Sequence, residues 1–212
     1  MRQRKVKNVE QRLDEYRAYS VKDGKTMRGN WHELFGNDQD LYMELGCGKG
    51  QFLLKQAEMN PNANFIGIEG QETIVLRALE KTATSNIVNI RFVQAFMQDL
   101  TEFFAASELS GIFLNFSDPW PKERHAKRRL THTRFLKGYE KILKPGSFIE
   151  FKTDNDHLFE FTLEEINQNG YEIVYCSRDL HQSDLDAKNI TTEYEDKFKA
   201  LGKNINYVRF II

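Results

Sequence analysis

Short apolar runs alternate with segments of helical periodicity from residue 41 to the end of the sequence. The apolar runs have the length of strands, and they occupy residues 41–46, 64–70, 87–95, 111–118, 147–154, 171–179 and 205–212. Segments with helical spacing lie between the first six runs, at residues 51–60, 71–83, 97–107, 131–146 and 156–170. This alternation predicts an α/β fold with a seven-stranded, mainly parallel sheet and helices on both faces.

The first 35 residues have a different character. Residues 1–28 carry nine Lys/Arg against four acidic residues, and GNWHELFG at residues 29–36 has the composition of a hinge. A basic segment of this kind is either a solvated helix face or part of a nucleic-acid surface. We therefore expect a basic, partly ordered N-terminal extension at residues 1–35 and a single domain at residues 36–212.

Composition restricts the location of the protein and its use of metals. No apolar run approaches the roughly 20 residues of a membrane-spanning helix, and no apolar stretch follows the basic N-terminus as in a secretory signal. The only cysteines are Cys47 and Cys176, which favours a reducing cytoplasm over a disulfide framework. The histidines are scattered without the spacing of metal ligands, so we expect no metal.

A glycine-rich loop, ELGCGKG at residues 44–50, follows the first apolar run. A P-loop requires Ser or Thr after its lysine, but Lys49 is followed by Gly50. A dinucleotide-binding loop has the spacing GxGxxG instead of GxGxG, and Glu44 would repel a pyrophosphate. S-adenosylmethionine has no phosphate and carries a sulfonium and an ammonium, so an acid at the mouth of the loop favours this ligand over the other two.

Further predicted cofactor contacts come from the ends of the second and third strands, because ligands of parallel sheets bind at carboxyl ends. The carboxylate of Glu69 can accept hydrogen bonds from both ribose hydroxyls. Phe96 is expected to pack against the adenine, and Gln98 to bond its amino group. The complete predicted set is Glu44, Gly46, Gly48, Gly50, Glu69, Phe96 and Gln98.

A proline-rich turn and a block of cations follow the fourth strand, in SDPWPKERHAKRRL at residues 117–130. The net charge of the chain is only −1, yet residues 122–137 hold seven Lys/Arg against one acid. Such a local patch is typical of nucleic-acid binding, and an aromatic ring beside it can stack on a base. The predicted RNA contacts are Trp120, Arg124, His125, Lys127, Arg128 and Arg129.

Four motifs together resemble the bacterial tRNA (guanine-N(7)-)-methyltransferase family. They are ELGCGKG, NFSDPWPKERHAKRRL, FKTDN at residues 151–155 and TEYEDKF at residues 192–198, and the resemblance extends from about residue 30 to the end. It implies a Rossmann-like class I methyltransferase fold. It also implies methylation of a guanine in the tRNA variable loop, at position 46, with S-adenosylmethionine as methyl donor.

The resemblance also assigns residues by motif. Glu44 and Glu69 become cofactor contacts, Asp118 becomes the catalytic residue, and the segment 124–129 contacts RNA. The implied substrate contacts are Lys122, Asp154, Thr192 and Glu195. The sequence departs from the family pattern at Phe96, where the family tends to have an acid.

Two alternative functions remain open at the level of sequence. One is an S-adenosylmethionine-dependent methyltransferase of another RNA or of a protein amino group, since the Asp-Pro-Trp turn resembles the Asp/Asn-Pro-Pro-aromatic loops of amino methyltransferases. The other is a non-catalytic RNA-binding protein with the same fold. The sequence gives no indication of whether the protein is a monomer or a homodimer.

Overall fold

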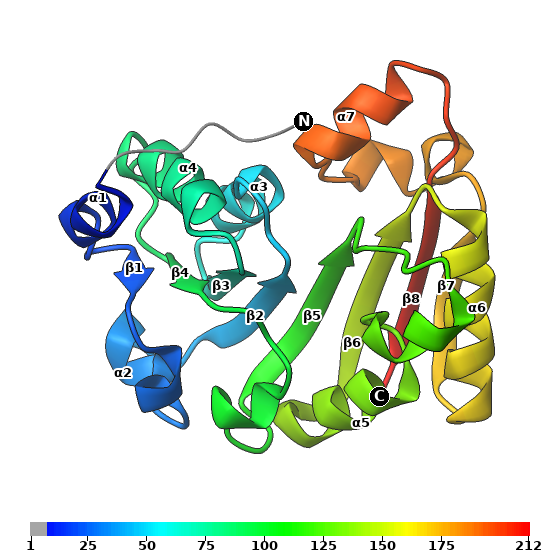
Figure 1. Ribbon diagram of the computed structural model, residues 1–212, viewed down its shortest axis with the longest axis horizontal. Helices are drawn as coiled ribbons and strands as arrows, with labels where there is room; N and C mark the ends of the chain where they lie inside the picture. The colour runs from blue at the N-terminus through cyan, green and yellow to red at the C-terminus, as the bar shows by residue number, and fades with distance from the viewer. Residues whose placement is uncertain (1–7) are drawn as a thin grey trace.

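The computed structural model describes residues 8–212, and the basic stretch at residues 1–7 lies outside the described residues. Its centre is an eight-stranded sheet in the order β1-β4-β3-β2-β5-β6-β8-β7 (Figure 1). The strands are β1 (Ser20–Val21), β2 (Asp40–Leu45), β3 (Ala63–Glu69), β4 (Ile90–Gln94), β5 (Leu109–Asn115), β6 (Leu143–Thr153), β7 (Glu172–Ser177) and β8 (Asn206–Ile211). All neighbouring strands are parallel except β8, which runs antiparallel to β6 and β7.

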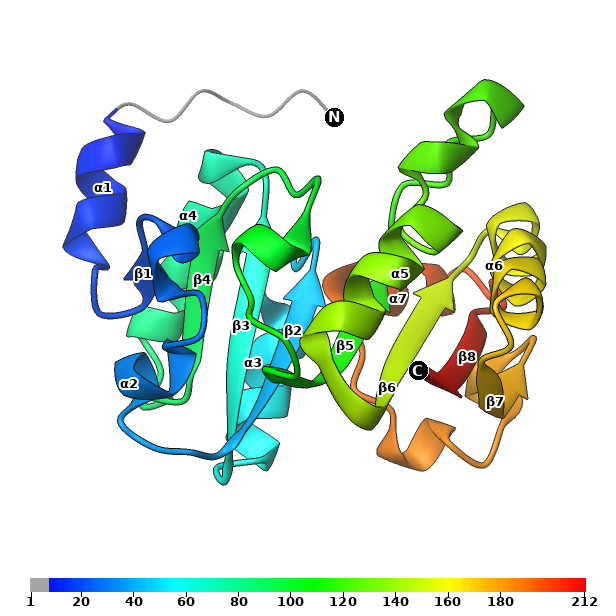
Figure 2. The same ribbon diagram turned by 90° about the horizontal axis from the view of Figure 1, so that it is seen from below.

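Helices cover both faces of this sheet (Figure 2). The α-helices are α1 (Val9–Glu15), α2 (Trp31–Phe35), α3 (Gln51–Met59), α4 (Glu72–Ala83), α5 (Thr133–Ile142), α6 (Asp156–Gln168) and α7 (Glu193–Lys199). Short 3-10 helices are η1 (Gly24–Met27), η2 (Leu100–Glu102), η3 (Glu123–Arg128), η4 (Leu180–Gln182) and η5 (Asp186–Lys188). The predicted α/β class with helices on both faces is confirmed.

Each face of the sheet has its own apolar core. Phe52 of α3 and Val75 of α4 pack with Phe92 of β4 on one face. On the other face, Leu136 of α5 and Phe159 of α6 belong to a larger cluster that continues to α2. The periodic apolar residues of the helices thus form the inner surfaces of two layers around the sheet.

The sheet has eight strands, so the predicted number of seven is wrong by one. The additional strand, β1, comes from the segment that we expected to be an extension, and it pairs with Phe92 and Val93 at the edge of β4. The expected hinge at residues 29–36 instead contains α2, whose Trp31 is completely buried and stacks on Phe104. The segment 20–35 is therefore anchored to the main core through its buried residues Val21 and Trp31.

The helix predicted at residues 97–107 is also wrong, since the structure has only the single turn η2 there. The Nε of Arg28 donates to the carbonyl of Thr101 at 2.8 Å, and the indole of Trp31 donates to the carbonyl of Phe103 at 3.0 Å. These side chains satisfy carbonyls that a helix would have satisfied internally. The tertiary contacts of a distant segment therefore replace the local helix.

The direction in which strands are added to the sheet reverses between β2 and β5. The strands that follow β2 in the chain, β3 and β4, lie on one side of it, and those that follow β5 lie on the other side. The loops that follow β2 and β5 therefore lead in opposite directions and leave a crevice at the carboxyl ends of these two strands. Doubly wound sheets bind their ligands in this crevice.

Candidate active site

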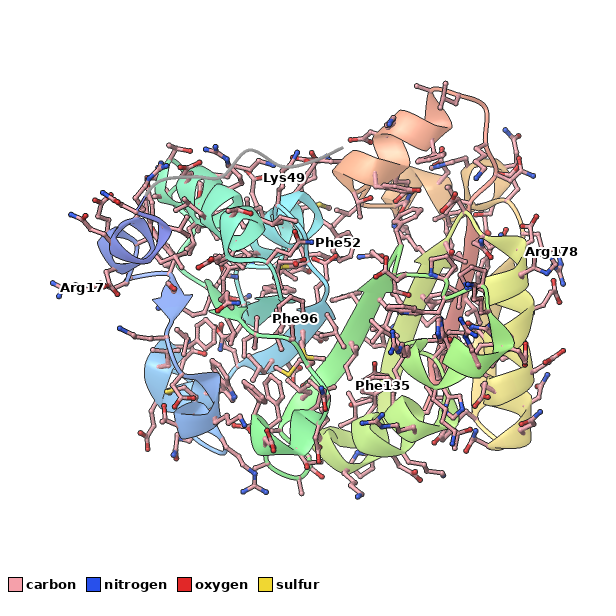
Figure 3. The ribbon with its side chains drawn as sticks, in the orientation of Figure 1. Arg17, Lys49, Phe52, Phe96, Phe135 and Arg178 are labelled. Atoms are coloured by element: carbon pink, nitrogen blue, oxygen red, sulfur yellow. The ribbon has the colours of Figure 1, made fainter. Side chains whose placement is uncertain are left out.

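A cleft of about 380 Å³ opens at this switch point. Its walls come from the loop after β2, the start of α3, the end of β5 and the helix α7. The lining residues that matter below are Glu44, Gly46, Gly48, Asn115, Phe116, Thr192 and Tyr194. Figure 3 labels Lys49 and Phe52, which line the cleft on the side of the glycine loop and α3.

Glu44 is the buried acid of this cleft. One carboxylate oxygen, Oε1, accepts a hydrogen bond of 2.7 Å from Nδ2 of Asn115. The other, Oε2, is buried and has no hydrogen-bond partner among the described residues. Burial raises the pKa of Glu44 to about 7, although Asn115 and the positive charge of Lys152 oppose that rise. An unsatisfied buried carboxylate oxygen is a site prepared for a cationic or hydrogen-bond-donating ligand.

The glycine loop bends through three left-handed residues, since φ is 80° at Gly46, 56° at Gly48 and 74° at Gly50. A Cβ at Gly46 or Gly48 would meet nothing within 4 Å, so these two glycines leave open space beside the cleft. A Cβ at Gly50 would lie 3.0 Å from Cβ of Ala78, so this glycine allows close packing on α4. The loop therefore needs glycine for its turn throughout and for close packing at one position.

Glu69 lies at the end of β3, beside the glycine loop. Its Oε2 accepts a hydrogen bond of 3.2 Å from the amide of Gly48, and its Oε1 accepts one of 2.9 Å from the amide of Gln71. These bonds orient the carboxylate, and each oxygen keeps a second lone pair for a ligand hydroxyl. The structure therefore brings Glu44, Glu69 and the glycines together.

Phe96 and Gln98 do not line the cleft. Phe96 is 79% exposed, and its ring lies over Gly70 so tightly that a side chain there would collide with it. Figure 3 shows it near the middle of the molecule. Gln98 is exposed and lines a different hollow, together with Arg134 and Phe135 of α5. An adenine contact by Phe96 or Gln98 stays a prediction.

The helix α7 forms the opposite wall of the cleft, beyond the carboxyl ends of β5 and β6 (Figure 1). Its N-cap is Thr192, whose hydroxyl accepts from the amide of Glu195 at 2.9 Å. Glu193 forms ion pairs with Lys49 and Lys81, which join α7 to the glycine loop and to α4. The TEYE motif thus serves as a helix start that places Thr192 and Tyr194 at the cleft.

Glu195 points away from the cleft and is completely buried. Its carboxylate accepts from Nζ of the buried Lys152 at 3.1 Å and from Nδ2 of Asn189 at 2.6 Å. Burial lowers the pKa of Lys152, and the negative charge of Glu195 opposes that shift. In this structure Glu195 ties α7 to β6 inside the protein, so a direct substrate contact stays a prediction that would require this pair to open.

The loop after β5 contains two bulky residues in the left-handed region. The φ angles are 51° at Phe116 and 41° at Trp120, a conformation that is rare and strained for aromatic residues. Phe116 lines the cleft and contacts the ring of Tyr194, with the centroids 5.0 Å apart. Asp118 lies between the two strained residues and is exposed. Strain of this kind is concentrated at functional sites.

The cations that follow this loop divide into two groups. Lys122, Arg124, Lys127 and Arg128 are exposed, and none forms an ion pair with another described residue. Arg128 lies 4.8 Å from the ring centroid of Trp120, and His125 meets that ring edge-on at 5.8 Å. Arg129, in contrast, is only 8% exposed and faces the protein.

Three other polar residues lie near the carboxyl ends of β5 and β6. Asp154, after β6, pairs with Lys203 at 2.6 Å, so a substrate would compete with that lysine for it. Sequence reasoning missed Asn115 and Lys152, although each is a polar residue within an apolar strand run. That interruption was a signal that could have identified both as partners of buried acids.

Two general findings concern the described part of the chain. Residues 8–212 contain no group of three or more His, Cys, Asp or Glu side chains arranged to hold a metal ion. None of the helices in that range combines the length and the apolar content that crossing a bilayer requires.

The residues of the cleft, together with Glu69 beside the glycine loop, fit S-adenosylmethionine. Glu44 offers an unsatisfied carboxylate oxygen, Gly46 and Gly48 leave space, and Glu69 is held ready by backbone amides. This cleft, at the switch point of a sheet in which an antiparallel β8 separates β6 from β7, defines a class I S-adenosylmethionine-dependent methyltransferase. Residues 38–208 match the model of the family described as "Putative methyltransferase".

The chain belongs to the tRNA (guanine-N(7)-)-methyltransferase family. It is 44% identical to the protein of that name from Geobacillus thermodenitrificans (strain NG80-2), with 97% of this chain and 94% of the relative covered. It is 45% identical to the Geobacillus kaustophilus (strain HTA426) protein of the same name, with the same coverage of 97% and 94%. The family suggested by the motifs is confirmed.

Solved structures with low sequence identity share the fold. An antibiotic-related methyltransferase superposes with a TM-score of 0.63 at 18% identity, covering 92% of this chain and 96% of that one. A methyltransferase described as S-adenosylmethionine-dependent, from Aquifex aeolicus, gives a TM-score of 0.55 at 15% identity and covers 97% and 89%. Both confirm the class I methyltransferase fold.

Proposed function

We propose that this protein transfers a methyl group from S-adenosylmethionine to N(7) of a guanine in tRNA. The observation that carries the proposal is the 44% identity to a tRNA (guanine-N(7)-)-methyltransferase over 97% of the chain. The finer target, guanine 46 in the variable loop, rests on the motif resemblance alone. Because its substrate is tRNA, we further propose that the enzyme works in the cytoplasm.

Glu44, the glycine loop and Glu69 would hold the cofactor. S-adenosylmethionine supplies an electrophilic methyl group next to a positive sulfur. The Oε2 of Glu44 would accept from its cationic end, and Glu69 would accept from ribose hydroxyls. With the cofactor fixed in the cleft, the remaining task of the chain is to orient the guanine.

Asp118 would orient the guanine and stabilise its charge. N(7) of guanine has a lone pair and no proton, so methylation requires no general base. The methylated purine is cationic, and a carboxylate beside it lowers the energy of the transition state. Correct alignment of the two reactants contributes much of the remaining acceleration. The strained residues on either side of Asp118 are consistent with a loop built to place one side chain.

The exposed cations would bind the tRNA backbone. Lys122, Arg124, Lys127 and Arg128 are free to contact phosphates, and Trp120 is half-buried beside them. The segment with η3 projects from the face covered by α5 and α6 (Figures 1 and 2). Thr192 at the cleft and Asp154 beside Lys203 would complete the guanine site.

The decisive experiment incubates the purified protein with bulk tRNA and labelled S-adenosylmethionine. After nuclease digestion, we expect the label in 7-methylguanosine. Label in another nucleoside, or only in a protein amino group, would refute the proposed reaction and support one of the alternative methyltransferases. Absence of transfer despite cofactor binding would favour a non-catalytic RNA-binding protein.

Asp118→Asn tests the catalytic assignment. We expect a rate at least about tenfold lower, because a neutral amide no longer stabilises the developing positive charge. Cofactor affinity should stay within about twofold, since Asp118 does not line the cofactor cleft. Rate and affinity are measured by single-turnover methylation and equilibrium dialysis. A variant with unchanged turnover would show that Asp118 is not required.

A further inference from the structure

We infer that Arg129 is a positioning residue for the Asp118–Trp120 loop and not a contact to RNA phosphates. The inference rests on the proposed function, because it concerns the loop that would hold the guanine. It assigns Arg129 a different role from that of Lys127 and Arg128, the two cations directly before it in the sequence.

The first argument is the direction of the side chain. Arg129 is 8% exposed, whereas Lys127 and Arg128 directly before it are exposed. Its guanidinium lies 4.3 Å from the ring centroid of Phe161 on α6. A guanidinium stacked on an aromatic ring beneath the loop has little surface left for a phosphate.

The second argument is what the guanidinium binds. Its Nε donates to the carbonyl of Pro119, and its Nη2 donates to the carbonyl of Trp120, both at 3.2 Å. Within residues 8–212, neither carbonyl accepts from a backbone amide. Pro119 and Pro121 have no amide hydrogen, so this loop has two fewer backbone donors of its own. The Arg129 side chain supplies the donors to both carbonyls.

The third argument is the strain of the residue that is held. Trp120 has a φ of 41°, which a tryptophan keeps only if its surroundings enforce it. Arg129 fixes the carbonyl of Trp120, while Arg128 covers the indole ring from outside. Two consecutive arginines therefore contact one tryptophan, Arg128 at its ring and Arg129 at its carbonyl, and only Arg129 is buried.

The test separates positioning from phosphate binding. Arg129→Lys keeps the charge but loses the planar fork that reaches both carbonyls. We expect its single-turnover rate at saturating tRNA to fall by about 10²-fold, as for a misplaced reactive group. The salt dependence of tRNA binding should match that of the wild type, because no phosphate contact is lost. Lys127→Ala is the comparison, and it should weaken binding and reduce the salt slope by a little under 1.

Phe161→Leu provides a second, independent variant. It removes the aromatic ring of α6 on which the Arg129 guanidinium stacks, and it leaves the exposed cations unchanged. We expect a lower single-turnover rate, as for Arg129→Lys, and an unchanged salt slope. Folding is checked by circular dichroism and cofactor binding. If Arg129→Lys keeps the wild-type rate, or Arg129→Ala reduces the salt slope as Lys127→Ala does, the inference is overturned. If the wild type itself forms no 7-methylguanosine, the proposed function fails instead.

Discussion

Cofactor affinity should depend on pH through Glu44. Burial raises the pKa of this carboxyl from 4.5 to about 7 in the free protein, so the group is largely protonated at pH 6. A protonated carboxyl cannot serve as the negative partner of a cationic ligand. Binding therefore has to include the loss of this proton, and the cost falls as the pH rises toward 8.

The magnitude follows from the size of the shift. With a pKa of about 7, roughly one molecule in ten has Glu44 ionised at pH 6 and about nine in ten at pH 8. The contribution of Glu44 to the affinity for S-adenosylmethionine, taken as the ratio of wild type to a variant that cannot ionise at this position, should thus increase about tenfold over this range and then level off. Near pH 6, binding should release close to one proton, which calorimetry in buffers of different ionisation enthalpy measures directly.

Glu44→Gln is the matched control for this prediction. Glutamine cannot ionise, so the variant should bind more weakly at pH 8 and show only the titration of the ligand itself. The difference between the two proteins isolates the contribution of Glu44. The same pH profile in both proteins would refute the reasoning about this buried acid.

Two further predictions concern stability. Lys152→Met should lower the free energy of unfolding by about 3–5 kcal/mol in urea titrations, because Glu195 is left buried without its cation. Adding Glu195→Gln should restore part of this loss. A loss below about 1 kcal/mol would contradict a buried ion pair. Gly50→Ala should destabilise by about 1–3 kcal/mol, since φ is 74° and its Cβ would lie 3.0 Å from Ala78. Gly138→Ala, in the open interior of α5, should instead stabilise by about 0.5–1 kcal/mol in the same assay; equal effects of both substitutions would speak against the geometric argument.

The sheet and the cleft follow from local patterns in the sequence. Strands β3 and β5 are buried at all but one position and appear in the sequence as nearly continuous apolar runs, which predicts them as strands and gives their order along the chain. The acids Glu44 and Glu69 end adjacent parallel strands, so their proximity could be deduced without coordinates. Local pattern and global fold agree at these positions.

Features that depend on distant partners could not be deduced in this way. The segment at 97–107 has helical spacing, but the side chains of Arg28 and Trp31 bind its carbonyls. Likewise, nothing in KRR at residues 127–129 distinguishes the arginine that faces α6 from the one that faces solvent. The direction of a side chain depends on how the loop folds back, and a count of charges contains no such information.

The short strand β1 has a consequence for aggregation. Without it, β4 would end the sheet and present free amides and carbonyls as a template for a strand of another molecule. Ser20 and Val21 pair along β4, and the amide of Phe92 donates to the carbonyl of Tyr19 at 2.7 Å. This protective segment precedes β4 in the chain, so it leaves the ribosome before the edge that it covers. The few residues of β1 are therefore available to cover β4 as soon as it forms, before β5 to β8 have been synthesised.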